Sequence, residues 1–342
     1  MTKPTVFIGM RTYNSQQYID NSLKSIYSQT YPNIKVIFYD DKSTDNTLSH
    51  LRIWKQKFAS RGIDCEIIES TSSTNEGCGK SAEHLGRVIA DRMSEHDIYM
   101  GLDSDDTFTA STVVESVVNQ MENYKADVCI AGYTIQGDAS LVINDKGGVP
   151  HNELSHRLAA LDKAVTVSEM PEIASIADSI GWSKITRGKI FKKYMEMYPK
   201  LPKEMNVCED FPTLAMFLYR GTHITGMPQN LYNYFKHPQS STAQIVQKEA
   251  FSVVRIGFLK VLQNIVKNNS NEFIDDAEKY VNAFIEKKYT VIGNIIDKKT
   301  SEGYLIGYNR QDFEHDFKTQ IDCHNLKLDR FSILPQTKEK SL

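Results

Sequence analysis

The sequence predicts an α/β fold in which a mostly parallel sheet is covered by helices on both faces. Within the first 135 residues, short runs rich in Val, Ile, Phe and Tyr alternate with segments whose apolar residues recur at helical spacing. Polar clusters follow four of these strand-like runs. Open α/β sheets bind their ligands outside the carboxyl ends of the strands, so the clusters lie where such a fold places a ligand site.

Five strands and four helices are expected in this part of the chain. The strand-like runs are bounded by turn residues and cover residues 5–10, 35–39, 65–69, 97–102 and 127–131. The helical segments between or after them cover residues 18–27, 48–58, 85–93 and 113–121. Each helix can connect two parallel strands, which is the repeated βαβ pattern.

The pattern loosens beyond residue 132. We expect a hairpin around Gly137 and Asp138, mixed short elements over 150–245 with a helix at 210–219 and a strand at 231–235, and amphipathic helices after residue 247. This predicts three parts: residues 1–135 and 136–245 as two halves of one domain, and 246–342 as a C-terminal helical extension.

The composition is that of a soluble globular protein. The 342 residues are 40% hydrophobic and 24% charged, and the net charge of −3 gives no overall attraction to nucleic acid. The five cysteines are widely spaced and form no CxxC pair, which favours reduced thiols. No apolar run approaches the roughly 18 residues of a membrane span. We therefore expect a cytoplasmic protein.

Three carboxylates follow the fourth strand, in the run Leu102-Asp103-Ser104-Asp105-Asp106. So much negative charge at the end of a buried strand favours a bound cation, and Mg²⁺ or Mn²⁺ prefers carboxylate oxygens. We therefore predict a metal site formed by these carboxylates. The alternative is that Asp106 or Thr107 only caps a helix that begins near Thr109.

The residues also carry a resemblance to a known family. The succession of a strand with "TYN", then "SIYSQTYPN", "DDKSTD" and "LDSDD" resembles the opening of a family 2 glycosyltransferase with the GT-A fold. It covers about the first 110 residues closely and continues more weakly to about residue 245. The resemblance implies a Rossmann-like GT-A domain and a metal-dependent, inverting transfer of a sugar from a nucleotide donor. In the family's DxD element, which the run at Asp103 matches, Asp105 or Asp106 would be the metal ligand.

The resemblance also implies which residues bind the donor. Asp41 would accept a hydrogen bond from the base, typically uracil, while Asp40 shapes the turn. The other donor-binding residues that it implies are Thr12, Tyr13, Asn14, Asn75, Gly77, Lys80, Asp103, Ser104, Trp182 and His237. The family's usual "ARN" is replaced here by Ser81-Ala82-Glu83, and Lys80 is either a phosphate contact or a solvated lysine at a helix start. Trp182 either stacks on a sugar or fills the core, and His237 or Lys236 contacts the diphosphate or the metal.

A catalytic base is implied by the pair Glu209-Asp210, which matches the family's "ED" pair. Asp210 would remove the proton from the acceptor hydroxyl, with Glu209 contacting acceptor or sugar. The simpler alternative is an acid favoured by the positive end of a helix dipole.

The sequence thus predicts a hexosyl- or N-acetylhexosaminyltransferase that uses a nucleotide-sugar, typically a UDP-sugar, and a glycan, lipid-linked or other hydroxyl acceptor. The rival interpretations are a nucleotidyltransferase and a non-catalytic scaffold that binds sugar nucleotides or glycans. The C-terminal apolar stripes would pack on the catalytic domain, form a homo-oligomer, or rest on the inner face of a membrane. Packing is favoured, because acidic residues interrupt any basic face.

Overall fold

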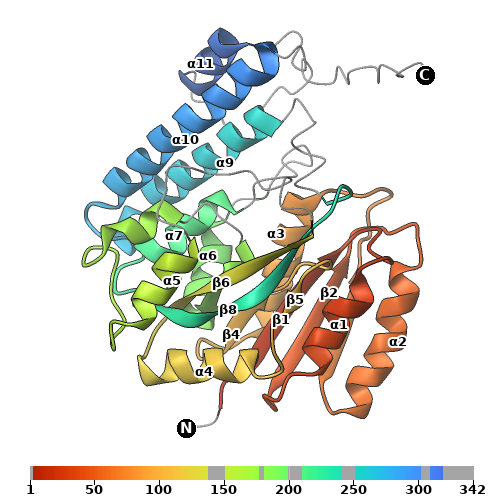
Figure 1. Ribbon diagram of the computed structural model, residues 1–342. Coiled ribbons are helices and arrows are strands. Elements are labelled where there is room, and N and C mark those ends of the chain that lie inside the picture. The colour runs from red at the N-terminus through yellow and green to blue at the C-terminus, as the bar shows by residue number, and fades with distance from the viewer. Residues whose placement is uncertain are drawn as a thin grey trace, which may run out of the picture.

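The computed structural model describes residues 3–137, 151–176, 181–198, 200, 210–240, 251–301 and 309–318. The expected hairpin after Gly137 and the residue Glu209 lie outside these ranges. The described residues form one sheet with helices on both of its faces and a helical layer at one end (Figure 1).

The sheet has eight strands in the order β3-β2-β1-β4-β7-β6-β8-β5. The strands are β1 Val6–Thr12, β2 Ile34–Asp40, β3 Asp64–Glu69, β4 Ile98–Gly101, β5 Thr107–Phe108, β6 Val128–Gly137, β7 Lys184–Arg187 and β8 Ile224–Lys236. Strands β3, β2, β1 and β4 are parallel, as the sequence predicts. The second half is mixed, because β7 is antiparallel to both β4 and β6, and β5 is antiparallel to β8.

The helices of the first half follow the βαβ pattern, in which each returns the chain to the start of a parallel strand. They are α1 Ile19–Tyr27, α2 Thr47–Ser60, α3 Cys78–Arg92 and α4 Val113–Asn123, and the rest of the domain adds α5 His151–Ala159, α6 Gly188–Met197 and α7 Leu214–Leu218. Short 3-10 turns lie at Pro171–Ile176 (η2), Gly181–Ser183 (η3) and Phe211–Thr213 (η4).

Three expectations are corrected in detail. No helix begins near Thr109: strand β5 comes first, and α4 begins at Val113 with Thr112 before it. The expected helix at 210–219 is the turn η4 followed by the five-residue α7. The expected strand at 231–235 is the end of the longer strand β8.

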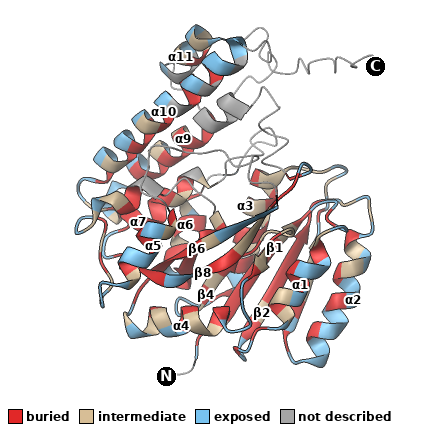
Figure 2. Cartoon of the chain, viewed as in Figure 1, coloured by how far each residue is buried: buried red, intermediate tan, exposed pale blue. Residues whose placement is uncertain are grey.

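The core lies on both faces of the sheet, and strands β1, β2, β4 and β7 are almost entirely buried (Figure 2). One buried cluster joins β1 and β2 to α1, α2 and α4. The other joins α3, α6 and α7 to the C-terminal helices α9 Phe251–Asn268, α10 Ala277–Ser301 and α11 Arg310–Lys318. The C-terminal helices therefore pack on the domain, as the sequence favours.

The junction between domain and extension is also fixed by polar and backbone contacts. Tyr219 pairs as an isolated bridge with Phe273, next to the turn η5 Ser270–Glu272. The guanidinium of Arg220 lies 2.8 Å from Asp275. Among the described helices, none combines the length and apolar character that crossing a bilayer requires.

Gly226 provides a test of the close approach of α5 to β8. A Cβ atom at Gly226 would lie 2.0 Å from the backbone oxygen of Ser155 in α5. We expect Gly226→Ala to lower the free energy of unfolding in urea by about 1–3 kcal/mol, because a backbone atom would have to move.

Gly86→Ala in α3 is the matched control. There the added methyl group meets the sulfur of Met195 at 2.8 Å, at the flexible end of a side chain, and alanine favours the helix. We expect little change in stability. Equal stability of the two variants would contradict the proposed packing constraint.

Candidate active site

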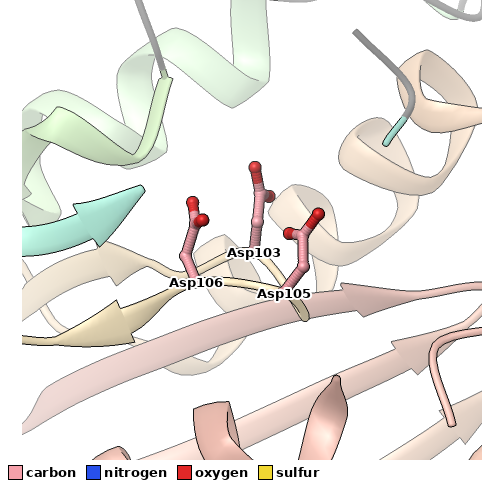
Figure 3. A group of neighbouring side chains, drawn as sticks. All are labelled: Asp103, Asp105 and Asp106. Atoms are coloured by element: carbon pink, nitrogen blue, oxygen red, sulfur yellow. The ribbon is translucent and has the colours of Figure 1, made fainter. Parts of the chain in front are cut away.

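The three carboxylates of the Asp triad (Asp103, Asp105 and Asp106) stand on the loop between β4 and β5 and point to the same side (Figure 3). One carboxylate oxygen from each lies within 4.8 Å of those of the other two. Like charges this close favour protonation of one of the groups or the presence of a cation. The arrangement is the one that the sequence predicts for this loop.

Asp106 is the buried member of the Asp triad. Its Oδ1 accepts a hydrogen bond from the backbone N–H of Phe235 at 2.8 Å, whereas its buried Oδ2 has no hydrogen-bond partner in the described structure. Burial, followed by the charges of Asp105 and Asp103, raises its pKa well above the usual range. The oxygen contacts β8 and not a helix end, so the alternative that Asp106 only caps a helix is wrong. An unpaired buried oxygen beside two other carboxylates fits a divalent cation.

Three basic groups surround the Asp triad. The ring Nε2 of His237 lies 2.9 Å from Oδ2 of Asp105, and a guanidinium nitrogen of Arg11 lies 3.3 Å from Oδ1 of Asp103. Lys236 is buried, which lowers its pKa to about 8, although the charges of the Asp triad act in the opposite direction. Its Nζ lies 3.6 Å from the centre of the Tyr234 ring.

His237 is therefore at the triad, and its ring also packs on that of Tyr18, with 4.1 Å between ring centres. The predicted site did not include Arg11, although a charged side chain one residue before the end of a buried strand could have drawn attention to it. Its guanidinium also donates a hydrogen bond to the carbonyl of Cys78 at 2.9 Å. Arg11 thus connects the Asp triad to the first residue of α3.

The ends of β1 and β2 are joined through Asp40. Its Oδ1 accepts hydrogen bonds from the hydroxyl groups of Thr12 and Ser43, and its Oδ2 accepts one from the backbone N–H of Ser43. Asn14 has φ of 49° and accepts a hydrogen bond from the N–H of Thr44 through its Oδ1. Tyr13 is 47% exposed, so its ring is available for stacking on a ligand.

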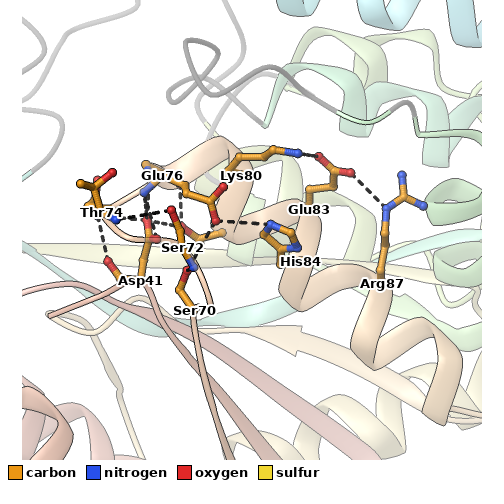
Figure 4. A network of polar contacts seen from close by, with 12 residues as sticks. Asp41, Ser70, Ser72, Thr74, Glu76, Lys80, Glu83, His84 and Arg87 are labelled. Atoms are coloured by element: carbon orange, nitrogen blue, oxygen red, sulfur yellow. Dashed lines mark hydrogen bonds and ion pairs between the residues drawn. The ribbon is translucent and has the colours of Figure 1, made fainter.

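Asp41 binds the loop that leads into α3 (Figure 4). Its side chain is buried, and its Oδ2 accepts hydrogen bonds from Asn75 Nδ2, the N–H of Gly77 and the hydroxyl of Ser81 at 2.8–3.0 Å. The N–H of Glu76 donates to both oxygens. Gly77 has φ of 89°, which favours glycine, and stands at the N-terminus of α3, where a negative charge is favoured.

Lys80 and Ser104 are held by neighbours within the protein. The Lys80 ammonium lies 3.1 Å from the buried carboxylate of Glu83, which also accepts a hydrogen bond from Arg87 at 3.2 Å (Figure 4). The hydroxyl of Ser104 shares a 2.7 Å hydrogen bond with Ser15, and its carbonyl accepts one from Ser22. Ser104 thereby fixes the loop of the Asp triad to the segment around α1.

Asp210 interacts with the strand that leads into the loop of the Asp triad. Burial raises the pKa of Tyr99 in β4 to about 12. The charge of Arg11 opposes this rise, while those of Asp103 and Asp210 contribute to it. The turn η3 links the two regions, because Trp182 lies against Gly101 at the end of β4 and Gly181 lies against the carboxyl group of Asp210.

The indole of Trp182 packs among aromatic side chains of β6 and β8. It is 6% exposed, and its ring centre lies 4.3 Å from that of Tyr232 and 5.7 Å from that of Tyr133. The structure thus places the indole in the core of the domain. Of the two alternatives for Trp182, this position favours core packing.

Parts of the chain resemble known glycosyltransferases. The profile of glycosyl transferase family 2 matches residues 7–158. An uncharacterized glycosyltransferase of Haemophilus influenzae is 52% identical over 48 residues, which cover 14% of this chain and 15% of that protein. The poly(ribitol-phosphate) beta-N-acetylglucosaminyltransferase TarS of Staphylococcus aureus is 23% identical over 263 residues, or 73% of this chain and 39% of TarS. The chain thus spans less than two thirds of the length of these relatives.

Solved structures share the fold. A crystal structure of S. aureus TarS has a TM-score of 0.58 at 16% identity, covering 96% of this chain and 54% of that chain. The Pyrobaculum calidifontis mannosyltransferase PcManGT, in complex with GDP-Man and Mn²⁺, has a TM-score of 0.53 at 13% identity, covering 94% and 85%. At these identities the likeness shows the fold alone.

The Asp41 network generates a prediction about stability. In Asp41→Asn an amide NH₂ replaces one of the two oxygens that accept hydrogen bonds from Gly77, Ser81 and Glu76. We expect the free energy of unfolding in urea to fall by about 2–4 kcal/mol, because buried donors lose their acceptors.

Ser81→Ala is the control, since it removes one donor and leaves the carboxylate intact. We expect it to cost about 1 kcal/mol. If Asp41→Asn were no more destabilising than Ser81→Ala, Asp41 would not hold the loop.

Proposed function

Because residues 7–158 form a family 2 glycosyltransferase domain and the chain has the GT-A fold, we propose that the protein transfers a sugar from a nucleotide-sugar to a hydroxyl acceptor. The transferred group is a hexosyl or N-acetylhexosaminyl residue, and the anomeric configuration is inverted. The observation that carries the proposal is the Asp triad, whose three carboxylates gather on the loop after β4, at the carboxyl edge of the parallel strands.

The proposed donor is a UDP-sugar. TarS, which shares the fold, has been solved in complex with UDP-GlcNAc, with a TM-score of 0.54. In this chain the exposed ring of Tyr13 would stack on the base. Asp41 Oδ1 accepts a hydrogen bond from the N–H of Glu76, and a carboxylate oxygen has the capacity to accept a further one from a base N–H.

Asp105 and Asp106 would hold a divalent cation, Mn²⁺ or Mg²⁺. The donor set fits, because hard cations prefer carboxylate oxygens and Asp106 Oδ2 is buried without a hydrogen-bond partner. When bound, such an ion neutralises charge on the diphosphate leaving group. His237 orients Asp105 through its Nε2, and Arg11 holds Asp103 towards the start of α3.

Asp210 is the proposed general base. The acceptor oxygen forms a bond to the anomeric carbon while the bond from that carbon to the diphosphate breaks, so the nucleoside diphosphate leaves with the electron pair. Asp210 takes the proton of the acceptor hydroxyl. A single displacement of this kind turns an α-linked donor into a β-linked product. The acceptor is a glycan, a lipid-linked sugar or another hydroxyl compound, as expected for glycan or polysaccharide synthesis.

Nucleotide and metal binding can be tested together by thermal shift. We expect UDP with Mn²⁺ to raise the melting temperature by several degrees, because a ligand that binds only the folded state stabilises it by mass action. GDP, CDP and ADP should have smaller effects, and removing Mn²⁺ should reduce the UDP effect.

Asp105→Asn should lose the Mn²⁺-dependent part of the shift. Asp91→Asn, which changes an exposed acid in α3, is the matched control and should behave as the wild type. A larger shift with GDP would replace UDP as the proposed donor nucleotide. The absence of any shift would contradict nucleotide binding.

Turnover tests the role of Asp210. We expect Asp210→Asn to slow UDP release from UDP-GlcNAc with Mn²⁺ by about 100-fold or more, since a general base contributes that much, while the UDP-induced thermal shift persists. With water as acceptor, proton NMR of the sugar released by the wild type should show the β anomer before mutarotation. An unchanged rate in Asp210→Asn, or an initial α anomer, would count against the mechanism.

A further inference from the structure

Lys184, at the start of β7, is a buried lysine whose charge interacts with that of Asp210. It is 2% exposed, and burial lowers its pKa to about 8, while the negative charge of Asp210 acts to raise it. Taking an ammonium group out of water is costly unless a carboxylate or other polar groups compensate it. The proposed mechanism does not use this charge, so its position beside the proposed base needs an explanation.

The segment that carries Lys184 also holds the carboxyl group of Asp210 in place. A Cβ atom built on Gly181 would lie 2.2 Å from Oδ1 of Asp210 and 3.1 Å from its Cγ. The Asp210 carboxyl group therefore lies directly against the Cα of Gly181, in the space that any other side chain would fill. Gly181 and Lys184 are three residues apart, and Trp182 anchors the turn between them in the core.

Two other titratable groups among the described residues interact electrostatically with this pair. His151, at the start of α5, interacts with Lys184, and burial together with the charge of Lys184 lowers the pKa of His151 to about 3. Tyr99 faces Asp210 from β4 with its pKa raised to about 12. On β6 the residue paired with Lys184 is the apolar Ile130. The charges of Arg11 and Asp103, which form an ion pair with each other, also affect the pKa of Tyr99.

Resting on the proposed function of Asp210 as the base, we propose that Lys184 and Gly181 are positioning residues for it. Lys184 keeps the Asp210 carboxylate ionised until it accepts the acceptor's proton, and Gly181 leaves the space in which that carboxylate lies. The two residues act through Asp210 and contact neither donor nor acceptor in this role.

The test is the pH profile of kcat for UDP release from UDP-GlcNAc with saturating Mn²⁺, in wild type, Lys184→Met and Lys184→Arg. An opposite charge nearby favours the ionised carboxylate, so we expect the acid limb in Lys184→Met to move up by about one pH unit or more. Lys184→Arg retains the positive charge and should keep the acid limb of the wild type. A Lys184→Met enzyme with an unmoved acid limb would overturn the role of Lys184.

Gly181→Ala separates position from charge. It should lower kcat by up to about 100-fold, because a small displacement of a reacting group can cost that much, with the acid limb and the KM for UDP-GlcNAc unchanged. Wild-type kcat in Gly181→Ala would overturn the positioning role. The melting temperature and the UDP-induced shift of each variant establish that it is folded. If Lys184→Met does not fold, the kcat values and pH profiles of Gly181→Ala and Lys184→Arg test the proposal instead.

Asp210→Asn distinguishes failure of this proposal from failure of the proposed function. If Asp210→Asn retains wild-type turnover, Asp210 is not the base and the proposed mechanism fails together with the role of Lys184. If Asp210→Asn is inactive and the acid limb does not respond to Lys184→Met, only the role of Lys184 fails. In the double variant, Lys184→Met should add no further loss to Asp210→Asn.

Discussion

Mutual repulsion within the Asp triad is the constraint on which the site is built. Carboxylates this close cannot all remain charged without positive charge nearby. The chain supplies positive charge from two strands that are not neighbours in the sheet, with Arg11 from β1 and Lys236 from the end of β8. His237, directly after β8, binds Asp105. The contact between Asp106 and the N–H of Phe235 joins the same loop to β8. The site therefore exists only when both halves of the domain are folded.

The first half of the fold could be predicted because its signals are local. Each parallel strand has its own apolar run and its own returning helix, and the polar clusters follow directly. The mixed half has no such signal. Strand β7 is four residues long and pairs with strands from two other parts of the chain, so the sequence around it resembles any short buried segment. Its neighbour η3 was not predicted for the same reason, and the helix predicted at 210–219 is shorter than expected.

The acidic residues of the candidate site could be predicted from the sequence, whereas the side chains that contact them were predicted less well. Asp103, Asp105 and Asp106 stand out because three acids in four residues need compensation, whichever fold surrounds them. The roles of Arg11 and Lys184 depend on contacts between segments that are distant in the sequence, so they could not be predicted from it. Asp41 was recognised from the motif, but its hydrogen bonds could not be predicted. They depend on the conformation of the loop before α3, which the motif does not specify. The contact made by Lys80 likewise depends on a departure from the family's motif. Glu83 stands where the family usually has another residue, and it gives Lys80 a partner within its own helix.

The position of β7 in the sheet limits where recombination could exchange segments between related proteins. The match to the family ends at residue 158, before β7, yet β7 lies between β4 and β6, both of which come earlier in the chain. A recombination point just after residue 158 would exchange β7 and leave its partners on both sides with a foreign strand. An intact module for recombination or grafting would extend at least through β8, which ends at Lys236.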